Sequence, residues 1–269
     1  MKIYVAVDME GISGIIDDEQ VIPGRSCYHE GRQYITEEVN ACVSGCIDGG
    51  ATEIIVADKH YNGRNFIWHE LDNRASYVIG RTENSPHGRM PGIDGCDGII
   101  LLGYHAMAGT PGAVLEHTWS PEIWQNLWIN EQPAGEIALE MGFAAEFGVP
   151  AIMISGDDKA CKEAVSLAPD IAVAQVKQGL TLCGAKLLSR GDAHALIRQK
   201  ASEAVKKCKE IAPPKFKLPV TMRLECVERT VSLSDVDKPY MKVLDARTFE
   251  VTGDLFTQAY YRLIKNVTQ

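Results

Sequence analysis

The sequence predicts an α/β fold: a three-layer α/β/α arrangement around a mainly parallel (mixed) sheet, followed by a smaller C-terminal α+β portion. Over the first two-thirds of the 269 residues, short and fully apolar runs alternate with amphipathic segments. Apolar runs of this kind are typical of parallel strands that helices cover on both faces. The last third instead alternates apolar and polar positions, which is typical of half-buried strands.

Four apolar runs are the expected strands of the main sheet. They cover residues 3–7, 53–57, 98–103 and 151–155. Segments with apolar residues at helical spacing separate them and predict helices. These segments cover residues 33–47, 136–147 and 159–168. Gly49, Gly148 and Pro169 follow the three segments, and glycine or proline at such positions indicates where a helix ends.

The C-terminal part has a different pattern. Its expected elements are a long polar helix at 191–211, strands at 219–227 and 247–252, and a helix at 255–264. Pro213 and Pro214 end the long helix. We therefore divide the chain into a metal-binding catalytic α/β region, residues 1–185, and a C-terminal helix-and-strand portion, residues 186–269. The second portion is either a small lobe or an extension of the same domain.

Bulk properties narrow the class of protein. A formal net charge of −9 disfavours nucleic acid and anionic membrane surfaces as partners, because both need a basic surface. No apolar run approaches the ~18 residues that span a bilayer. The apolar start of the chain meets Asp8 and Glu10 at once, so it is expected to be the first strand rather than a signal peptide. The eight cysteines contain no C-x-x-C pair and are expected to be free thiols of a cytoplasmic protein.

Acidic and imidazole side chains follow three of the predicted strands. Asp8 and Glu10 come directly after the first strand, His60 follows the second, and His105 follows the third. Because the carboxyl ends of parallel strands meet at one edge of the sheet, these side chains are expected to converge where ligands bind. Each has a structural interpretation by itself, and only their coincidence favours a metal site. Mixed nitrogen and oxygen ligands suit zinc, with manganese or iron as alternatives.

Three further positions leave two interpretations open. Glu136 begins a predicted helix, so it is either another ligand or an acid that favours the helix dipole. His117 lies in a loop and is either a reactive group or an ordinary surface histidine. Asp157 and Asp158 follow the fourth strand; we interpret them as an N-cap for the next helix, with a substrate contact as the alternative.

Other residues are interpreted as structural. Gly11 and Gly14 lack the G-x-G-x-x-G spacing of a nucleotide loop, so they are expected to let the backbone turn tightly. Trp119, Trp124 and Trp128 are close in sequence; lining a pocket is one interpretation, and packing in the core or an interface is the one we favour. Histidines without a strand-end context are expected to be structural or exposed, namely His29, His69, His87 and His194.

Several blocks of sequence, in order over residues 1–160, resemble the DppA-type zinc-dependent D-aminopeptidase family. They are YVAVDMEGISG (4–14), ADKH (57–60), GYHA (103–106), TPG (110–112), PAGE (133–136) and GDD (156–158). The resemblance implies a metallo-aminopeptidase with two zinc ions per subunit. In this arrangement Asp8 bridges both ions. The remaining ligands are Glu10 and His60 for one ion, and His105 and Glu136 for the other.

The resemblance also implies a reaction and an assembly. His117 matches the catalytic histidine of the family. It would assist a hydroxide held between the zinc ions in removing N-terminal D-amino acids, such as D-Ala, from short peptides. The family forms ring-shaped homodecamers whose active sites face an internal channel, so self-association of this kind is expected here. Lys59 and Glu116 depart from the family pattern, which bears on the substrate.

Two other functions stay open from the residues alone. A two-metal phosphoesterase, or another amide hydrolase acting on a small substrate, would use a similar site, with Lys59, Arg64 or Arg81 available to hold phosphate. A non-catalytic, metal-stabilised peptide-binding scaffold would instead close both metal shells with protein ligands.

Overall fold

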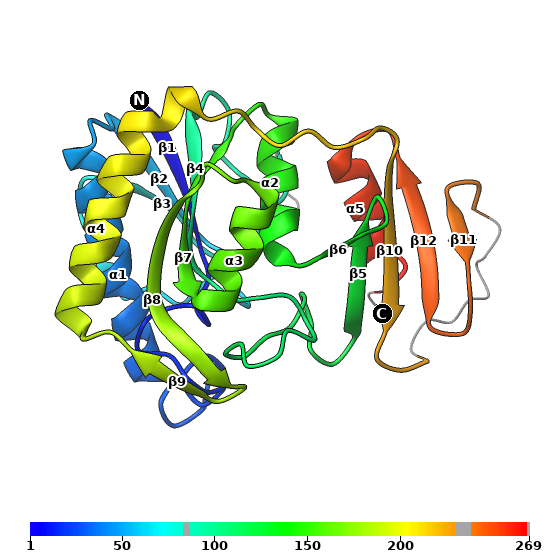
Figure 1. Ribbon diagram of the computed structural model, residues 1–269, viewed down its shortest axis with the longest axis horizontal. Helices are drawn as coiled ribbons and strands as arrows, with labels where there is room; N and C mark the ends of the chain where they lie inside the picture. The colour runs from blue at the N-terminus through cyan, green and yellow to red at the C-terminus, as the bar shows by residue number, and fades with distance from the viewer. Residues whose placement is uncertain (83–86, 230–237, 268–269) are drawn as a thin grey trace.

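In a computed structural model that describes residues 1–82, 87–229 and 238–267, the chain forms two sheets (Figure 1). The larger sheet has the strand order β3-β2-β1-β4-β7-β8-β9, and its neighbouring strands are parallel except for β9. Its strands are β1 (Lys2–Val7), β2 (Glu53–Asp58), β3 (Ser76–Val78), β4 (Gly98–Tyr104), β7 (Ala151–Asp157), β8 (Ala172–Thr181) and β9 (Gly184–Leu187).

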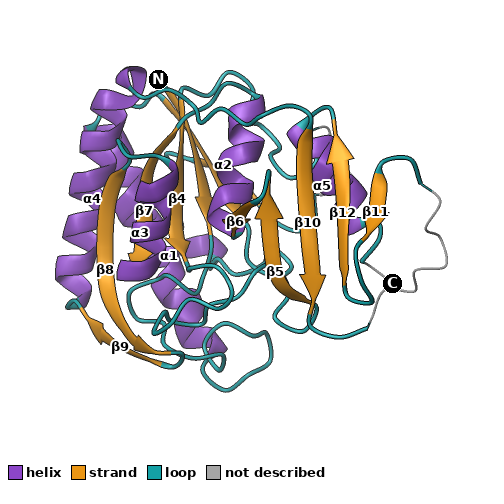
Figure 2. Cartoon of the chain, turned by 45° about the vertical axis from the view of Figure 1, so that its right-hand side comes forward, coloured by secondary structure: helices purple, strands orange, loops and turns teal. Residues whose placement is uncertain are grey.

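Helices cover both faces of this sheet (Figures 1 and 2). One layer contains α1 (Tyr28–Asp48) and α4 (Arg190–Lys207), and the other contains α2 (Glu136–Glu146) and α3 (Asp158–Leu167). Side chains alternate along β1, so Ile3 and Val5 join the apolar core under α1 and α4, while Tyr4 and Ala6 join the core under α2. Both faces of the strand are therefore buried, which is why its sequence is an unbroken apolar run.

The smaller sheet is antiparallel, with the order β11-β12-β10-β5-β6. Its strands are β5 (Trp124–Ile129), β6 (Gln132–Ala134), β10 (Val220–Cys226), β11 (Met241–Val243) and β12 (Thr248–Gly253). Helix α5 (Phe256–Ile264) packs on β10 and β12 and also against α2, where Phe143 meets Phe256 and Tyr260 edge-on. Two short 3-10 helices, η1 (Trp68–Glu70) and η2 (Cys208–Glu210), complete the described elements.

The predicted fold class is confirmed, but the two sheets do not follow the expected division at residue 185. Helix α4 packs against α1 of the larger layer, because Gly45 lets the helices approach: a Cβ there would lie 2.3 Å from the carbonyl oxygen of Arg198. In turn, β5 and β6 precede residue 185 yet belong to the smaller sheet, since β5 pairs with β10. Pairing between strands far apart in the chain leaves no mark on the local pattern.

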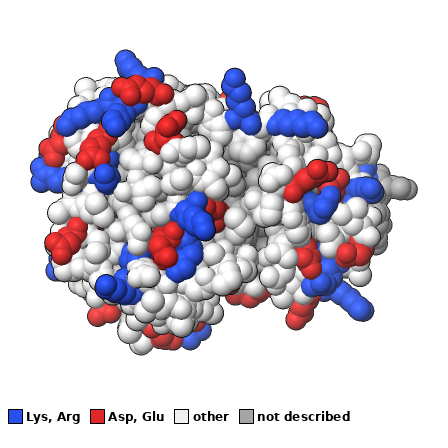
Figure 3. Space-filling view, viewed as in Figure 1, with Lys and Arg blue, Asp and Glu red and all other residues white. Residues whose placement is uncertain are grey.

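The charged surface, the helices and the cysteines each have the features of an ordinary globular protein. On the face that Figure 3 shows, basic and acidic side chains are interspersed over both lobes. None of the helices in the described ranges has the length and apolar character needed to cross a membrane. All eight cysteines are free thiols, and Cys42 and Cys46 of α1 are fully buried in the core, as their spacing predicted.

Candidate metal centre

Successive strands of the larger sheet are added on one side of β1 up to β3 and on its other side from β4 onward, so the strand order switches between β1 and β4. The candidate residues lie at the carboxyl ends of these strands. β2 and β3 lie on one side of β1, whereas β4 and β7 lie on the other. In open α/β sheets such a switch leaves a crevice that binds ligands. Gly11 allows the exits of the two strands to approach, since a Cβ there would lie 2.1 Å from the carbonyl oxygen of Tyr104. Gly103 adopts a φ of +72°, a conformation that favours glycine.

The first group of candidate ligands is Asp8, Glu10 and His60. These residues are only 5%, 4% and 9% exposed. Nδ1 of His60 lies 3.2 Å from Oδ1 of Asp8 and 3.1 Å from Oε2 of Glu10. One ligand atom from each residue lies within 4.8 Å of the others, so the group is compact enough to hold a metal ion.

Asp58 and Asn65 hold the segment that carries His60. The backbone N–H and side-chain amide of Asn65 donate to the Asp58 carboxylate at 2.7 and 2.8 Å. The same amide donates to the carbonyl oxygen of His60 at 2.8 Å, and the Tyr28 hydroxyl donates to Oδ1 of Asn65 at 2.7 Å. The sequence reasoning did not identify these two residues. The only available signal was an acid at the strand end, two residues before His60.

Lys177 holds the segment that carries Glu10. This lysine of β8 is 2% exposed, and its Nζ donates to the carbonyl oxygens of Glu10, Ile12 and Ile15 at 2.6, 2.8 and 2.6 Å. The three bonds use all three donors of an ammonium group. Burial lowers the pKa of Lys177 to about 8. Sequence reasoning missed this residue as well, because β8 itself was not predicted.

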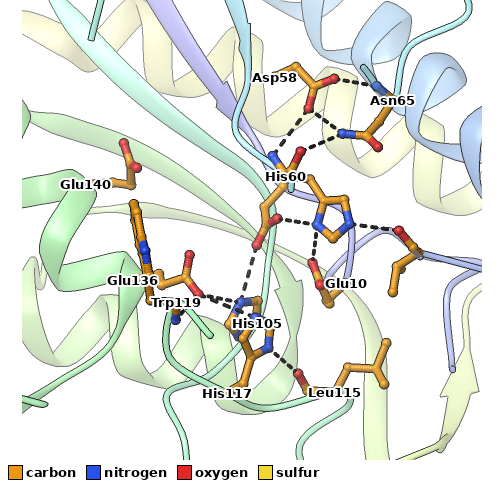
Figure 4. A network of polar contacts seen from close by, with 12 residues as sticks. Glu10, Asp58, His60, Asn65, His105, Leu115, His117, Trp119, Glu136 and Glu140 are labelled. Atoms are coloured by element: carbon orange, nitrogen blue, oxygen red, sulfur yellow. Dashed lines mark hydrogen bonds and ion pairs between the residues drawn. The ribbon is translucent and has the colours of Figure 1, made fainter. Parts of the chain in front are cut away.

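The second group of candidate ligands is His105, His117 and Glu136 (Figure 4). Nε2 of His105 lies 3.3 Å from Oε1 of Glu136, and Nε2 of His117 lies 3.6 Å from the same oxygen. The two imidazole rings stack with their centroids 4.0 Å apart. The side chains of His117 and Glu136 are 17% and 16% exposed, so this group is more open to solvent than the first.

The carboxylate of Asp8 lies between the two groups. Its Oδ1 faces His60, whereas its Oδ2 lies 3.4 Å from Nε2 of His105. One side chain at the end of β1 therefore offers an oxygen to each group, which is the geometry that a bridging ligand needs.

The ring nitrogen of each imidazole that points away from the carboxylates has a hydrogen-bond partner, and this partner shows whether the opposite nitrogen can bind a cation. Carbonyl oxygens face one ring nitrogen of each histidine at 2.9 Å: that of Val21 for His60, Ala106 for His105 and Leu115 for His117. Because a carbonyl oxygen only accepts, the proton lies on that nitrogen, and a neutral ring then turns a lone pair toward the carboxylates. Metal-ligating histidines are held in this way.

Buried atoms without hydrogen-bond partners support the same conclusion. Within the described part of the chain, Oδ2 of Asp8, Oε2 of Glu10 and Nε2 of His105 are buried and have no hydrogen-bond partner. Buried polar atoms are rarely left without one. A cation held by these oxygen and nitrogen atoms would satisfy them together, and the donor set fits zinc.

The carboxylates and imidazoles shift one another's pKa values. Burial and the charge of Glu10 raise the pKa of Asp8 to about 7. Burial opposes ionisation of Glu136, but its close contact and charge interaction with the imidazole of His105 lower the pKa of Glu136 to about 2. Burial disfavours the charged forms of His60 and His105, yet the neighbouring carboxylates raise the pKa of both well above 6.5. Protons and a metal ion therefore compete for the same ring nitrogens.

Two hydrogen bonds position the loop that carries His117. Oδ1 of Asp157 accepts from the first backbone N–H groups of α3, which confirms the predicted N-cap, and its Oδ2 accepts from the N–H of Val114 at 2.9 Å. On the other side of His117, the backbone N–H of Trp119 donates to Oε1 of Glu136 at 2.7 Å. Packing was the role expected of Trp119, so its contact with a candidate ligand was missed.

The remaining histidines lie elsewhere. His29 is exposed, and the others pair with single acids: His69 with Glu70, His87 with Asp94 and His194 with Glu37. Among the described residues, none of the four belongs to a group that could hold a metal ion. The side chain of Lys59, a candidate for binding phosphate, is 7% exposed and lies 3.7 Å from Oε2 of Glu140, so it faces an internal acid.

Comparisons with known proteins were consistent with one another. A family model described as D-aminopeptidase, Peptidase_M55, matches residues 1–265. The chain is 38% identical over 218 residues to the D-aminopeptidase of Bacillus subtilis (strain 168), covering 80% of this chain and 78% of that protein. It is also similar to the solved structure of the Zn-dependent D-aminopeptidase DppA from Bacillus subtilis, a self-compartmentalizing protease. The TM-score is 0.91 at 31% identity, over 98% of this chain and 96% of that one.

Proposed function

This chain belongs to the D-aminopeptidase family Peptidase_M55, and from that premise we propose that it is a binuclear zinc enzyme that removes N-terminal D-amino acids, such as D-Ala, from short peptides. Membership of the family makes the chain a metallo-aminopeptidase. The proposal of two ions rests on the position of Asp8, which turns one carboxylate oxygen toward each group of candidate ligands.

Each zinc ion would have its own ligands in addition to Asp8. Glu10 and His60 would hold one ion, and His105 and Glu136 would hold the other. The hydrogen bonds from the imidazoles to backbone carbonyls support these roles, because they leave the opposite ring nitrogen to bind a cation.

His117 is the residue proposed to act on the substrate. When bound, zinc lowers the pKa of water and polarises the carbonyl group of the scissile bond. Nδ1 of His117 faces the carbonyl oxygen of Leu115, so Nε2 is the nitrogen turned toward the reaction. A proton on Nε2 would stabilise the oxyanion and then pass to the leaving amine. The partial exposure of His117 supports a role at the substrate rather than in the core.

We also propose that the enzyme self-associates into a ring-like homo-oligomer, a decamer, around its active sites. The support is the similarity to a structure described as a self-compartmentalizing protease. Such a ring would admit short peptides and exclude folded proteins. Light scattering coupled to size-exclusion chromatography tests it: a mass near ten chains is expected, and a monomer at working concentration would contradict the assembly.

A substrate panel tests the activity itself. Zinc-reconstituted protein is offered matched D-alanyl and L-alanyl dipeptides and a small phosphate ester, and zinc per chain is measured by elemental analysis. We expect turnover of the D-alanyl peptides, two zinc ions per chain, and loss of turnover on chelation. Hydrolysis of the phosphate ester alone, or of the L-alanyl peptides alone, would overturn the proposed function.

A further inference from the structure

Trp119 has an unusual backbone conformation beside the candidate ligands. Its φ is +63°, in the left-handed region that a bulky residue rarely adopts. Backbone conformations of this kind persist only where the surroundings hold them, and they are found most often at functional sites. In this conformation the N–H of Trp119 points to Oε1 of Glu136 at 2.7 Å.

The indole ring is held from several sides. The guanidinium carbon of Arg89 lies 4.2 Å from the ring centroid, in a cation–π contact. The ring of Tyr260 meets the indole edge-on at 5.4 Å, and Trp124 lies beside it at 6.0 Å. These contacts fix the side chain, and through it they fix the backbone on which the N–H depends.

Arg89 is itself held by the helix that carries Glu136. Its Nη2 donates to Oε1 of Glu140 at 2.9 Å, in an ion pair whose side chains are 14% and 2% exposed. Glu136 and Glu140 are one turn apart on α2, and Figure 4 shows both beside Trp119. The contacts therefore form a closed path: Glu140 holds Arg89, Arg89 covers Trp119, and Trp119 donates to Glu136.

We propose that Trp119 and Arg89 are positioning residues for the second zinc ion. The clamped indole keeps residue 119 in the left-handed conformation, and this conformation keeps the carboxylate of Glu136 oriented toward His105. The inference rests on the proposed zinc site and extends it, since neither Trp119 nor Arg89 is a proposed ligand. Hydrogen bonds to ligating carboxylates and imidazoles of this kind commonly change metal affinity by about 10–100-fold.

A series at position 119 separates positioning from packing. We expect Trp119→Phe to keep the affinity for the second zinc ion close to that of wild type, because a ring remains for Arg89 to cover. Trp119→Ala loses the ring and keeps the strain, so its affinity should fall by about tenfold or more. Trp119→Gly loses the ring but adopts a positive φ without strain, so its affinity should lie between those of the other two. If Trp119 only filled space, glycine would be the worst of the three.

The readout is zinc affinity, measured by competition with a chromophoric chelator, beside zinc per chain and circular dichroism to check folding. Arg89→Lys gives a second route: it keeps a positive charge beside Glu140 but removes the planar guanidinium, and we expect weaker binding of the second ion. Arg223→Lys is the matched control, since Arg223 covers Trp128 at 6.0 Å in the smaller sheet and should leave both affinities unchanged.

The outcomes separate this inference from the proposed function. Two zinc ions in wild type, with affinity in the order Phe, Gly, Ala at position 119, would support the inference. Two zinc ions in wild type with unchanged affinity in Trp119→Ala, or with glycine below alanine, would overturn it and leave the proposed function intact. Fewer than two zinc ions in reconstituted wild type would contradict the binuclear function and the inference with it.

Discussion

The two groups of candidate ligands differ in how the fold holds them. Asp8, Glu10 and His60 are at most 9% exposed and follow directly from the ends of β1 and β2. In the second group, His117 and Glu136 are 17% and 16% exposed, and His117 comes from the loop between β4 and β5. Buried side chains brace the first group, whereas the left-handed backbone of Trp119 braces the second.

From this difference we expect the two groups to have different roles within one site. A buried group with satisfied supports is preorganised, so it should bind its ion tightly and respond little to substrate. A partly exposed group on a loop can meet the substrate, and it should bind its ion more weakly. Asp8 is a member of the first group, and because its Oδ2 also faces His105 of the second group, it couples the two.

The largest effect is expected from Asp8→Ala, because it removes the oxygens that face His60 in the first group and His105 in the second. We expect the loss of metal from both groups and a fall in activity of more than about 10³-fold, beyond the usual loss for one polar group. Elemental analysis and peptide turnover measure the two effects. Asp48→Ala, at an exposed acid at the end of α1, is the control. Retention of two zinc ions in Asp8→Ala would remove this residue from the site and the coupling with it.

His117→Ala tests whether the open group serves the substrate. We expect kcat to fall by about 10²–10⁴-fold, the range for a general acid or base, while two zinc ions stay bound. His194→Ala, at a histidine paired with Glu37 on α1, is the matched control. Loss of one zinc ion in His117→Ala would show instead that His117 is a ligand, because its Nε2 lies within reach of the second group.

Asn65→Ala removes a support of the first group, just as a change at Trp119 removes a support of the second. It removes the hydrogen bonds from the amide to Asp58 and to the carbonyl oxygen of His60. We expect the affinity for the first zinc ion to fall by about 10–100-fold while the second is unchanged. Chelator competition measures both affinities. Asn40→Ala is the control, since the Asn40 amide donates to the Glu70 carbonyl at an exposed position. Equal weakening of both ions would indicate general loss of structure rather than a local support.

A change of pH tests both groups without any substitution. In the metal-free protein the neighbouring carboxylates raise the pKa values of His60 and His105, so both rings keep their added proton to higher pH than a free imidazole and must lose it to bind zinc. Zinc affinity should therefore rise with pH, by about tenfold per pH unit for each proton released. Calorimetry in buffers of different ionisation enthalpy counts those protons. An affinity independent of pH between about pH 6 and 8 would contradict the competition.

Stability should follow the opposite trend when metal is absent. A folded pKa above the unfolded value means that the two histidines stabilise the metal-free fold fully below about pH 6.5. That contribution is lost as pH rises through the raised folded pKa values. The difference in Tm between zinc-loaded and metal-free protein should therefore grow as pH increases.

Much of the site was accessible to sequence reasoning because strand ends are local features. The apolar runs located β1, β2 and β4, and Asp8, His60 and His105 lie within two residues of the ends of these strands. The supports were not accessible. Trp119 was expected only to pack, and Lys177 lies on a strand that was not predicted, yet both reach the segments that carry candidate ligands. Their roles depend on a backbone angle and on contacts between distant segments, which composition and spacing do not report.

Local sequence patterns were enough to predict the fold class, the apolar runs that form the parallel strands, and the acids and imidazoles at the carboxyl ends of those strands. Hydrophobic periodicity and turn residues involve only a few residues that are adjacent in the sequence, so they can be recognised without a structure. Three features appear only in the folded molecule: β5 pairs with β10, α4 lies on α1, and the backbone N–H of Trp119 donates to Glu136. These features depend on which distant surfaces fit together, and that fit is a property of the folded molecule as a whole.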